Sequence, residues 1–135
     1  MSVIVTDSGF AADDWTHGFT RLGEAANDVV ALDVPSDIDP ASLAGQLDGV
    51  GIIRVDFPSF ADGRGFTIAR QLRLMGYRGR LRARGHVIAD QYAMARRCGF
   101  DEVEISTDLA ARQPVDQWLF RARWQSHDYQ SRLRG

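Results

Sequence analysis

The stretch Val50-Gly51-Ile52-Ile53-Arg54-Val55-Asp56-Phe57, with the loop and the segment 66–75 that follow it, decides the fold. Its apolar, β-branched run predicts a strand that is buried on both faces of a parallel sheet. In the segment 66–75, apolar residues recur at helical spacing, which predicts an amphipathic helix. Gly76 is expected to end that helix in the left-handed conformation. Together these segments predict one strand–helix unit.

The same pattern returns 23 residues further along the chain, where Gly99-Phe100 repeats the ending Gly76-Tyr77. Residues 80–84 alternate in character, which predicts a strand with one face or one edge in water. Residues 87–98 are the matching helix. The other predicted elements are strands at 3–5, 29–34 and 102–106, a loop with a short helix at 8–23, a short helix at 40–47 capped by Asp39, and a helix at 114–124.

Strands that alternate with helices predict an α/β protein with a mostly parallel sheet. We expect a single domain over residues 1–135, with about five strands and flanking helices. A doubly wound sheet is the first arrangement to consider. A half-barrel-like arrangement of the same βα units is the alternative.

The net charge of −2 conceals an uneven distribution of charge. Residues 1–62 carry 11 acidic and 2 basic side chains, whereas residues 63–135 carry 7 acidic and 14 basic ones. The two halves are therefore expected to attract each other, either within one chain or across a homodimer. An arginine-rich half suits planar oxyanions, because the guanidinium fork binds them in bidentate fashion. The scattered arginines and the negative total make nucleic acid an unlikely partner.

Composition also limits the chemistry and the location. No apolar run is long enough to span a bilayer, and the first residues lack a signal peptide, so a cytoplasmic location is expected. The single cysteine, Cys98, excludes an internal disulfide, a dithiol redox pair and a cysteine-ligated iron–sulfur cluster. It is interpreted as a buried structural thiol. The sequence holds no fingerprint for nicotinamide, flavin, metal or iron–sulfur cluster, so any cofactor stays unknown.

The candidate catalytic residues follow the ends of two predicted strands. Ligands of parallel α/β folds bind beyond the carboxyl ends of the strands, where Asp56, His86 and residues 106–108 are expected to gather. His86 suits general acid–base work because its ordinary pKa lies near neutrality, and Asp56 would be a site carboxylate. The alternatives are a packing role for His86 and an ion pair with an arginine for Asp56.

The loop Asp62-Gly63-Arg64-Gly65 is the candidate binding surface, together with Arg70 on the helix that it opens. Free N–H groups at a helix start favour an anion, glycines let it approach the backbone, and Arg64 adds a charged fork. The loop would bind an oxyanion or a partner protein. The alternative is a tight turn in which Asp62 caps the helix. No metal-ligand spacing connects the three histidines.

A set of stretches along the chain is distinctive when taken together: Phe57-Pro58-Ser59-Phe60-Ala61-Asp62-Gly63-Arg64-Gly65-Phe66, Ala69-Arg70-Gln71-Leu72-Arg73, Gly76-Tyr77, Leu81-Arg82-Ala83, Asp90-Gln91 and Arg97-Cys98-Gly99-Phe100-Asp101. Through these stretches residues 29–106, and more weakly the tail through Tyr129-Gln130, resemble an uncharacterised bacterial family labelled "oxidoreductase probably involved in sulfite reduction". The genes of family members lie beside those for the sulfite/nitrite reductase haemoprotein and the adenylylsulfate reductase. The resemblance implies a place in sulfate assimilation, with those two enzymes as partners. The family has an acidic residue where this chain has His86, which counts against a catalytic histidine.

Three functions are compatible with these patterns, and whether the protein is an enzyme is left open. The first is an accessory or regulatory protein of assimilatory sulfate/sulfite reduction that binds an oxyanion or a partner reductase through the loop 62–65. The second is a cofactor-dependent oxidoreductase of sulfite reduction. The third is a binding module for another anionic metabolite.

Overall fold

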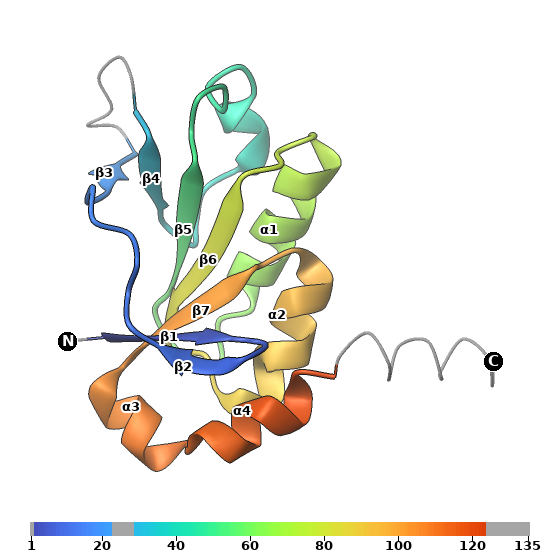
Figure 1. Cartoon of the computed structure of the whole chain (residues 1–135). Coiled ribbons are helices and arrows are strands. Elements are labelled where there is room, and N and C mark those ends of the chain that lie inside the picture. Colours follow the sequence, from blue (N-terminus) through green and yellow to red (C-terminus); the bar gives the residue numbers. More distant parts are fainter. Residues whose placement is uncertain (1, 23–28, 124–135) are drawn as a thin grey trace, which may run out of the picture.

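The computed structural model describes residues 2–22 and 29–123, which form one seven-stranded sheet with helices against it (Figure 1). The strand order is β2-β1-β7-β6-β5-β4-β3. The strands from β3 to β7 are parallel, and β1 pairs antiparallel with both β7 and β2. The strands are β1 (Ser2–Thr6), β2 (Gly9–Ala11), β3 (Thr20–Arg21), β4 (Ala31–Val34), β5 (Ile52–Phe57), β6 (Arg80–Gly85) and β7 (Glu102–Ser106). The helices are η1 (Pro40–Leu43), α1 (Arg64–Leu74), η2 (Ala89–Gln91), α2 (Tyr92–Cys98), α3 (Thr107–Arg112) and α4 (Val115–Arg121).

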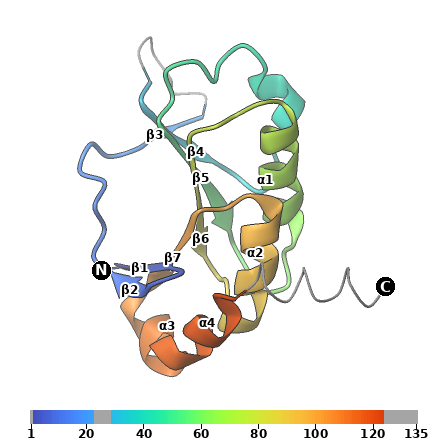
Figure 2. The ribbon, with the colours of Figure 1, turned by 45° about the vertical axis from the view of Figure 1, so that its right-hand side comes forward.

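Helices α1 and α2 lie side by side against one face of the sheet, as the two views show (Figures 1 and 2). The reason is topological. From β4 to β7 each strand is added on the same side of its predecessor, and right-handed crossovers that all run in one direction place their helices on one face. The predicted α/β class with a mostly parallel sheet is confirmed. The one-sided layering corresponds to the half-barrel-like alternative rather than to a doubly wound sheet.

The count of seven strands, rather than about five, comes from the amino-terminal region. The short helix predicted within 8–23 is wrong: that segment holds β2 and β3 joined by irregular chain. The predicted helix at 40–47 is the shorter 3₁₀ turn η1, in which Asp39 accepts a hydrogen bond from the amide of Ala41 as expected of a cap. Helix α3 was not predicted from the sequence.

The two strand–helix units end in the same way. Gly76 and Gly99 both have positive φ, 98° and 112°. The amides of Tyr77 and Phe100 each donate 3.0 Å back to the carbonyl five residues earlier. This is the left-handed helix ending that the Gly-aromatic repeat predicted, and it turns each aromatic ring back into the core.

The apolar core lies between the sheet and the helices. Ile53, Val55 and Phe57 alternate along β5 and are buried. The ring of Phe57 packs edge-on against Phe66 of α1, with 5.0 Å between centroids. A Cβ at Gly65 would lie 2.4 Å from the Phe57 ring, so only glycine lets the first turn of α1 sit this close to β5.

Candidate functional site

The sheet face turned away from α1 and α2 carries charged side chains in two rows that cross the parallel strands. Strand pairing places these side chains next to one another, because residues in register share a face. The expectation that β5 is buried on both faces therefore holds only in part: on this face Ile52 is buried and the Arg54 side chain is 16% exposed, whereas the Asp56 side chain is 46% exposed. The first row is Asp33, Arg54, Arg82 and Glu102, and the second is Asp56, Arg84 and Glu104.

Arg82 lies at the centre of this charged face and is fully buried. Its guanidinium contacts Glu102 at 2.6 Å, Glu104 at 2.9 Å and Asp13 at 3.1 Å. Burial acts to lower the pKa of Arg82, but the nearby Glu102 and Glu104 carboxylates raise it overall. Within the described residues, its Nη2 atom has no hydrogen-bond partner. The prediction that β6 has a wet face is therefore wrong at Arg82, in the middle of that strand. There, carboxylates and the chain that overlies them take the place of water.

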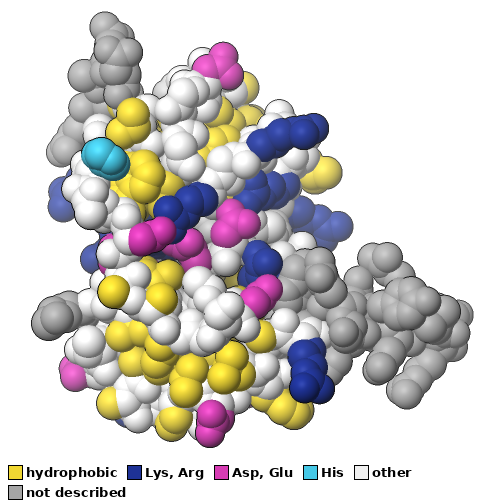
Figure 3. All heavy atoms as spheres, viewed as in Figure 1, with side chains coloured by type: hydrophobic (Ala, Val, Ile, Leu, Met, Phe, Trp, Pro, Cys, Tyr) yellow, Lys and Arg dark blue, Asp and Glu magenta, His cyan; other side chains and the backbone are white. Residues whose placement is uncertain are grey.

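The overlying chain is the segment 12–19, which we call the strap. It joins β2 at one edge of the sheet to β3 at the other (Figure 1). Asp14 pairs with Arg80 at 2.8 Å, and the ring of Phe19 lies 3.8 Å from the guanidinium carbon of Arg54. Figure 3 shows side chains of both signs gathered across the middle of the molecule.

The strap also shows how the two oppositely charged halves of the sequence meet. Asp13 and Asp14 belong to the acidic half, and they contact Arg82 and Arg80 of the basic half. At least part of the attraction predicted from the composition is therefore satisfied within one chain.

The carboxyl ends of β5, β6 and β7 meet around a depression of about 410 Å³, as predicted. Asp56, His86 and Ser106 all line it, whereas Thr107 and Asp108, which were also expected there, do not. His86 is turned toward the backbone, with Nδ1 3.2 Å from the Phe57 carbonyl oxygen and its ring edge-on to Phe60 at 4.9 Å. The nearest basic group to Asp56 is Arg84, at 3.9 Å. The structure thus brings both candidate catalytic residues to one rim, where the His86 ring contacts the Phe57 carbonyl and the Phe60 ring.

Arg64 lies outside that depression, in an ion pair of its own. Its Nη2 donates to Asp62 at 2.7 Å and to Ser36 at 3.0 Å, and its backbone amide donates to the Asp62 carboxylate at 3.0 Å. These bonds lower the pKa of Asp62 to about 2. The tight turn is therefore present, but Asp62 is not the N-cap of α1: that position is Gly63, and no side chain caps the helix. The Asp62 carboxylate instead accepts from the amide of Arg64, the first residue of α1, where an anion would compete with it.

Two other predicted residues lie further away from the rim. Arg70 is an exposed side chain on α1, near Cys98. Cys98 is partly buried against the core, and burial raises the pKa of its thiol, which fits a structural role.

A second depression, of about 260 Å³, opens at the same rim on the charged face of the sheet. Sequence reasoning missed it. The spacing of Arg80, Arg82 and Arg84 indicates a charged face, because alternate residues of a strand share a face. Of these three arginines, Arg84 lines the depression. The residues that line it are Arg21, Leu22, Asp33, Val34, Pro35, Arg54, Asp56 and Arg84.

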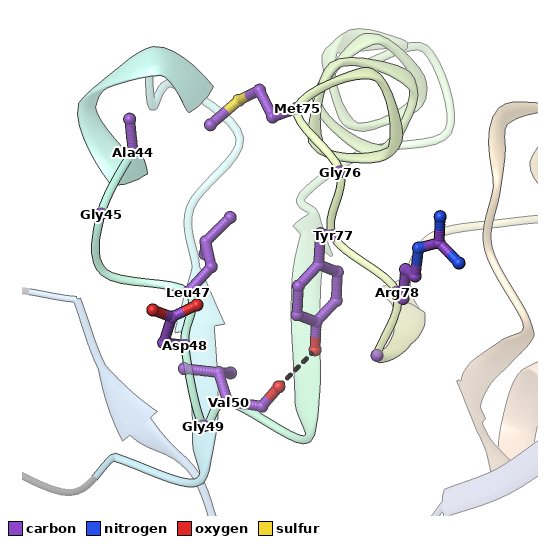
Figure 4. A pocket seen from close by; sticks show the side chains of 11 residues that line it. Ala44, Gly45, Leu47, Asp48, Gly49, Val50, Met75, Gly76, Tyr77 and Arg78 are labelled. Atoms are coloured by element: carbon purple, nitrogen blue, oxygen red, sulfur yellow. Dashed lines mark hydrogen bonds between the residues drawn. The ribbon is translucent and has the colours of Figure 1, made fainter.

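A third depression, of about 500 Å³, lies at the opposite end of the sheet (Figure 4). Its walls are the chain segments 44–50 and 75–79, which the Tyr77 hydroxyl links by donating to the Val50 carbonyl at 3.0 Å. Burial raises the pKa of Tyr77 to about 12, so this phenol stays protonated. The hollow sits before β5 and β6, at the end of parallel strands where such folds do not place ligands.

Two general observations apply to the described residues. They hold no group of three or more His, Cys, Asp or Glu side chains placed to bind a metal ion. None of their helices is long and apolar enough to cross a membrane.

Residues 31–135 match the sequence model of a family described as a bacterial protein of unknown function, DUF934. The chain belongs to this family. The DUF934 match includes the loop 57–65, both candidate catalytic residues and Arg84, whereas β1, β2, β3 and the strap precede it. No curated protein and no solved structure matches the chain.

Proposed function

We propose that this protein is an accessory or regulatory component of assimilatory sulfite reduction that binds a partner reductase through the loop 57–65, here called the docking loop. The family resemblance supplies the pathway. The geometry of the docking loop supports binding to a partner protein. It is a rigid loop that presents an aromatic ring and an arginine to solvent.

The rigidity comes from contacts made by three neighbouring segments. Ser36 accepts a hydrogen bond from Arg64, and the side-chain amide of Gln91 donates to the Phe60 carbonyl at 3.3 Å. His86 packs against Phe60 and approaches the Phe57 carbonyl. A loop that is already ordered loses little conformational entropy on binding, which favours affinity.

The exposed side chains carry the proposal. Phe60 is 42% exposed although its ring could pack into a core, and the Arg64 side chain is 59% exposed. Aromatic residues and arginine are enriched at the centres of protein–protein interfaces. A small oxyanion at this loop would have to compete with Asp62 for Arg64 and would gain nothing from Phe60. A protein surface faces the same competition at Arg64 but also gains the apolar contact with Phe60, so the docking loop favours a protein partner.

The test is binding of the purified protein to the sulfite/nitrite reductase haemoprotein, measured by surface plasmon resonance, with adenylylsulfate reductase as a second partner. We expect Phe60→Ala and Arg64→Ala each to weaken binding at least about tenfold, the loss typical of a central interface residue. Leu74→Ala and Arg78→Ala are matched controls at the opposite end of α1, where Leu74 is 80% exposed. These controls should bind like the unmodified protein.

Absence of binding to both enzymes would refute the proposal, as would equal binding by the loop variants and the controls. A reducible chromophore in the purified protein would instead favour the alternative, a cofactor-dependent oxidoreductase.

A further inference from the structure

We propose that the second depression, here called the mouth, binds a small oxyanion that also carries a hydrogen-bond donor, such as a hydroxy acid, an amino acid or hydrogen phosphate. This inference does not depend on the docking proposal. The mouth lies on the charged face of the sheet, whereas the docking loop leads into α1 on the other face. The residues that carry the proposal are Arg21, Arg84 and Asp56.

The mouth is placed where parallel α/β folds bind ligands. It opens beyond the ends of β4 and β5, with Val34 and Pro35 on one side and Arg84 of β6 on the other. Its volume of about 260 Å³ is below the roughly 300–1,000 Å³ of sites for drug-sized ligands. The mouth therefore suits a small polar molecule rather than a dinucleotide.

The Arg84 guanidinium can donate further hydrogen bonds. Its side chain is half-exposed, lies 3.5 Å from Glu104 and 3.9 Å from Asp56, and makes no hydrogen bond within the described part of the chain. Arg54 beside it is fully engaged, with two bonds to Asp33 at 2.6 and 2.8 Å and one to Glu104 at 3.1 Å. The guanidinium of Arg84 is thus the group in the mouth that an incoming oxyanion can bind in bidentate fashion.

The charge of the mouth favours an anion. Its lining includes three arginines and two aspartates, which leaves one positive charge in excess. The fork of Arg54 neutralises Asp33, and Glu104 lies between Arg54 and Arg84, at 3.1 and 3.5 Å. The positive excess of the lining therefore falls to Arg21 and to the part of the Arg84 charge that Glu104 does not compensate. Arg21 is exposed and forms no ion pair with a described residue, so it is able to contribute a second cation to the same ligand.

Asp56 determines the second part of the ligand. Its carboxylate is about half-exposed, and its one ion-pair contact in the described chain is the 3.9 Å approach to Arg84, which is too long for a hydrogen bond. An oxyanion beside this carboxylate is repelled unless it also offers Asp56 a donor. A hydroxyl or ammonium group next to the oxyanion supplies that donor, so one ligand bridges Arg84 and Asp56.

The experiment compares four small anions by amide chemical-shift changes in solution, up to about 10 mM and at constant ionic strength. Acetate and sulfate offer no donor, whereas glycolate and phosphate do. We expect glycolate to bind more tightly than acetate, and phosphate more tightly than sulfate, with shifts centred on the ends of β4, β5 and β6. In Asp56→Asn both preferences should disappear, because the amide can also donate to the anion.

Arg84→Ala should weaken glycolate binding at least about tenfold, the loss expected when one charged hydrogen-bonding partner is removed. Arg84→Lys keeps the charge but loses the fork and should bind less tightly than the unmodified protein. Arg78→Ala is the control for loss of one exposed positive charge. Circular dichroism checks that each variant is folded.

The inference is overturned if none of the four anions shifts the rim residues, or if Arg84→Ala and Arg84→Lys both bind as Arg78→Ala does. These outcomes are independent of docking, because Arg84→Ala leaves Phe60 and Arg64 in place and should bind the partner reductase normally.

Discussion

The two faces of the sheet are buried by different kinds of contact, apolar on one face and ionic on the other. The face under α1 and α2 is covered by apolar side chains such as Val55, Leu72 and Phe100. The other face buries a network of ions centred on Arg82, beneath a strap that contributes two aspartates. Apolar packing stabilises without specifying partners, whereas a buried ion requires each opposite charge to be in place. The ionic face therefore carries the mouth, and the apolar face provides the rigid support.

The largest expected effect comes from breaking the ionic face at its centre. Arg82→Met should lower the free energy of unfolding by about 3–5 kcal/mol, because Glu102 and Glu104 would lose their one fully buried counter-charge. They would keep only the partly exposed Arg80, Arg54 and Arg84 as partners. Arg82→Lys keeps the charge and should lose less. Urea denaturation measures both. A loss below about 1 kcal/mol for Arg82→Met, or equal losses for the two variants, would contradict a stabilising network.

The apolar face is tested by Leu72→Ala. Leu72 lies on the buried side of α1 and is fully buried, so the lost contacts and the resulting cavity should cost about 2–5 kcal/mol. The loss should be the same in low and high salt, because no charge is involved. A loss that depends strongly on salt would show that the two faces are not independent.

The strap should contribute less than either face. Asp14 is largely exposed, and the Arg80 guanidinium lowers the pKa of its carboxyl by hydrogen bonding. Asp14→Ala should therefore cost less than about 1 kcal/mol. Because screening is strong at about 1 M salt, the cost should nearly vanish there. A loss as large as that of Arg82→Met would mean that the strap, rather than the pairing of strands, holds the ionic face together.

The smallest effect belongs to the ion pair of the docking loop, in which Arg64 is exposed and the Asp62 side chain is largely covered. Since Arg64 holds the pKa of Asp62 at about 2, below its ordinary value of 3.8, the pair contributes above that ordinary value and is lost as pH falls toward 2. A carboxyl-carbon NMR titration should give a midpoint near 2. In Arg64→Ala the midpoint should return toward 3.8. An unchanged midpoint would show that another group holds Asp62 ionised.

Local patterns were enough to predict much of the fold from the sequence. The repeat of Gly76-Tyr77 at Gly99-Phe100 identified two strand–helix units, because a left-handed residue and a returning aromatic ring are properties of a few consecutive residues. The rim position of Asp56 and His86 followed from the rule for parallel strands.

The tertiary structure alone decided what covers each face. The alternation of arginines at 80, 82 and 84 shows that the three side chains share a face. It does not show whether their guanidinium groups are hydrated or paired with buried carboxylates, because both arrangements satisfy the charge. The outcome depends on Glu102, Glu104 and Asp13, which lie far away in sequence and reach Arg82 only through strand order and the strap. Likewise, Arg64 and Arg84 look alike in the sequence. In the folded protein Arg64 is paired with Asp62, whereas Arg84 lies 3.9 Å from Asp56 and can still donate hydrogen bonds to a ligand in the mouth.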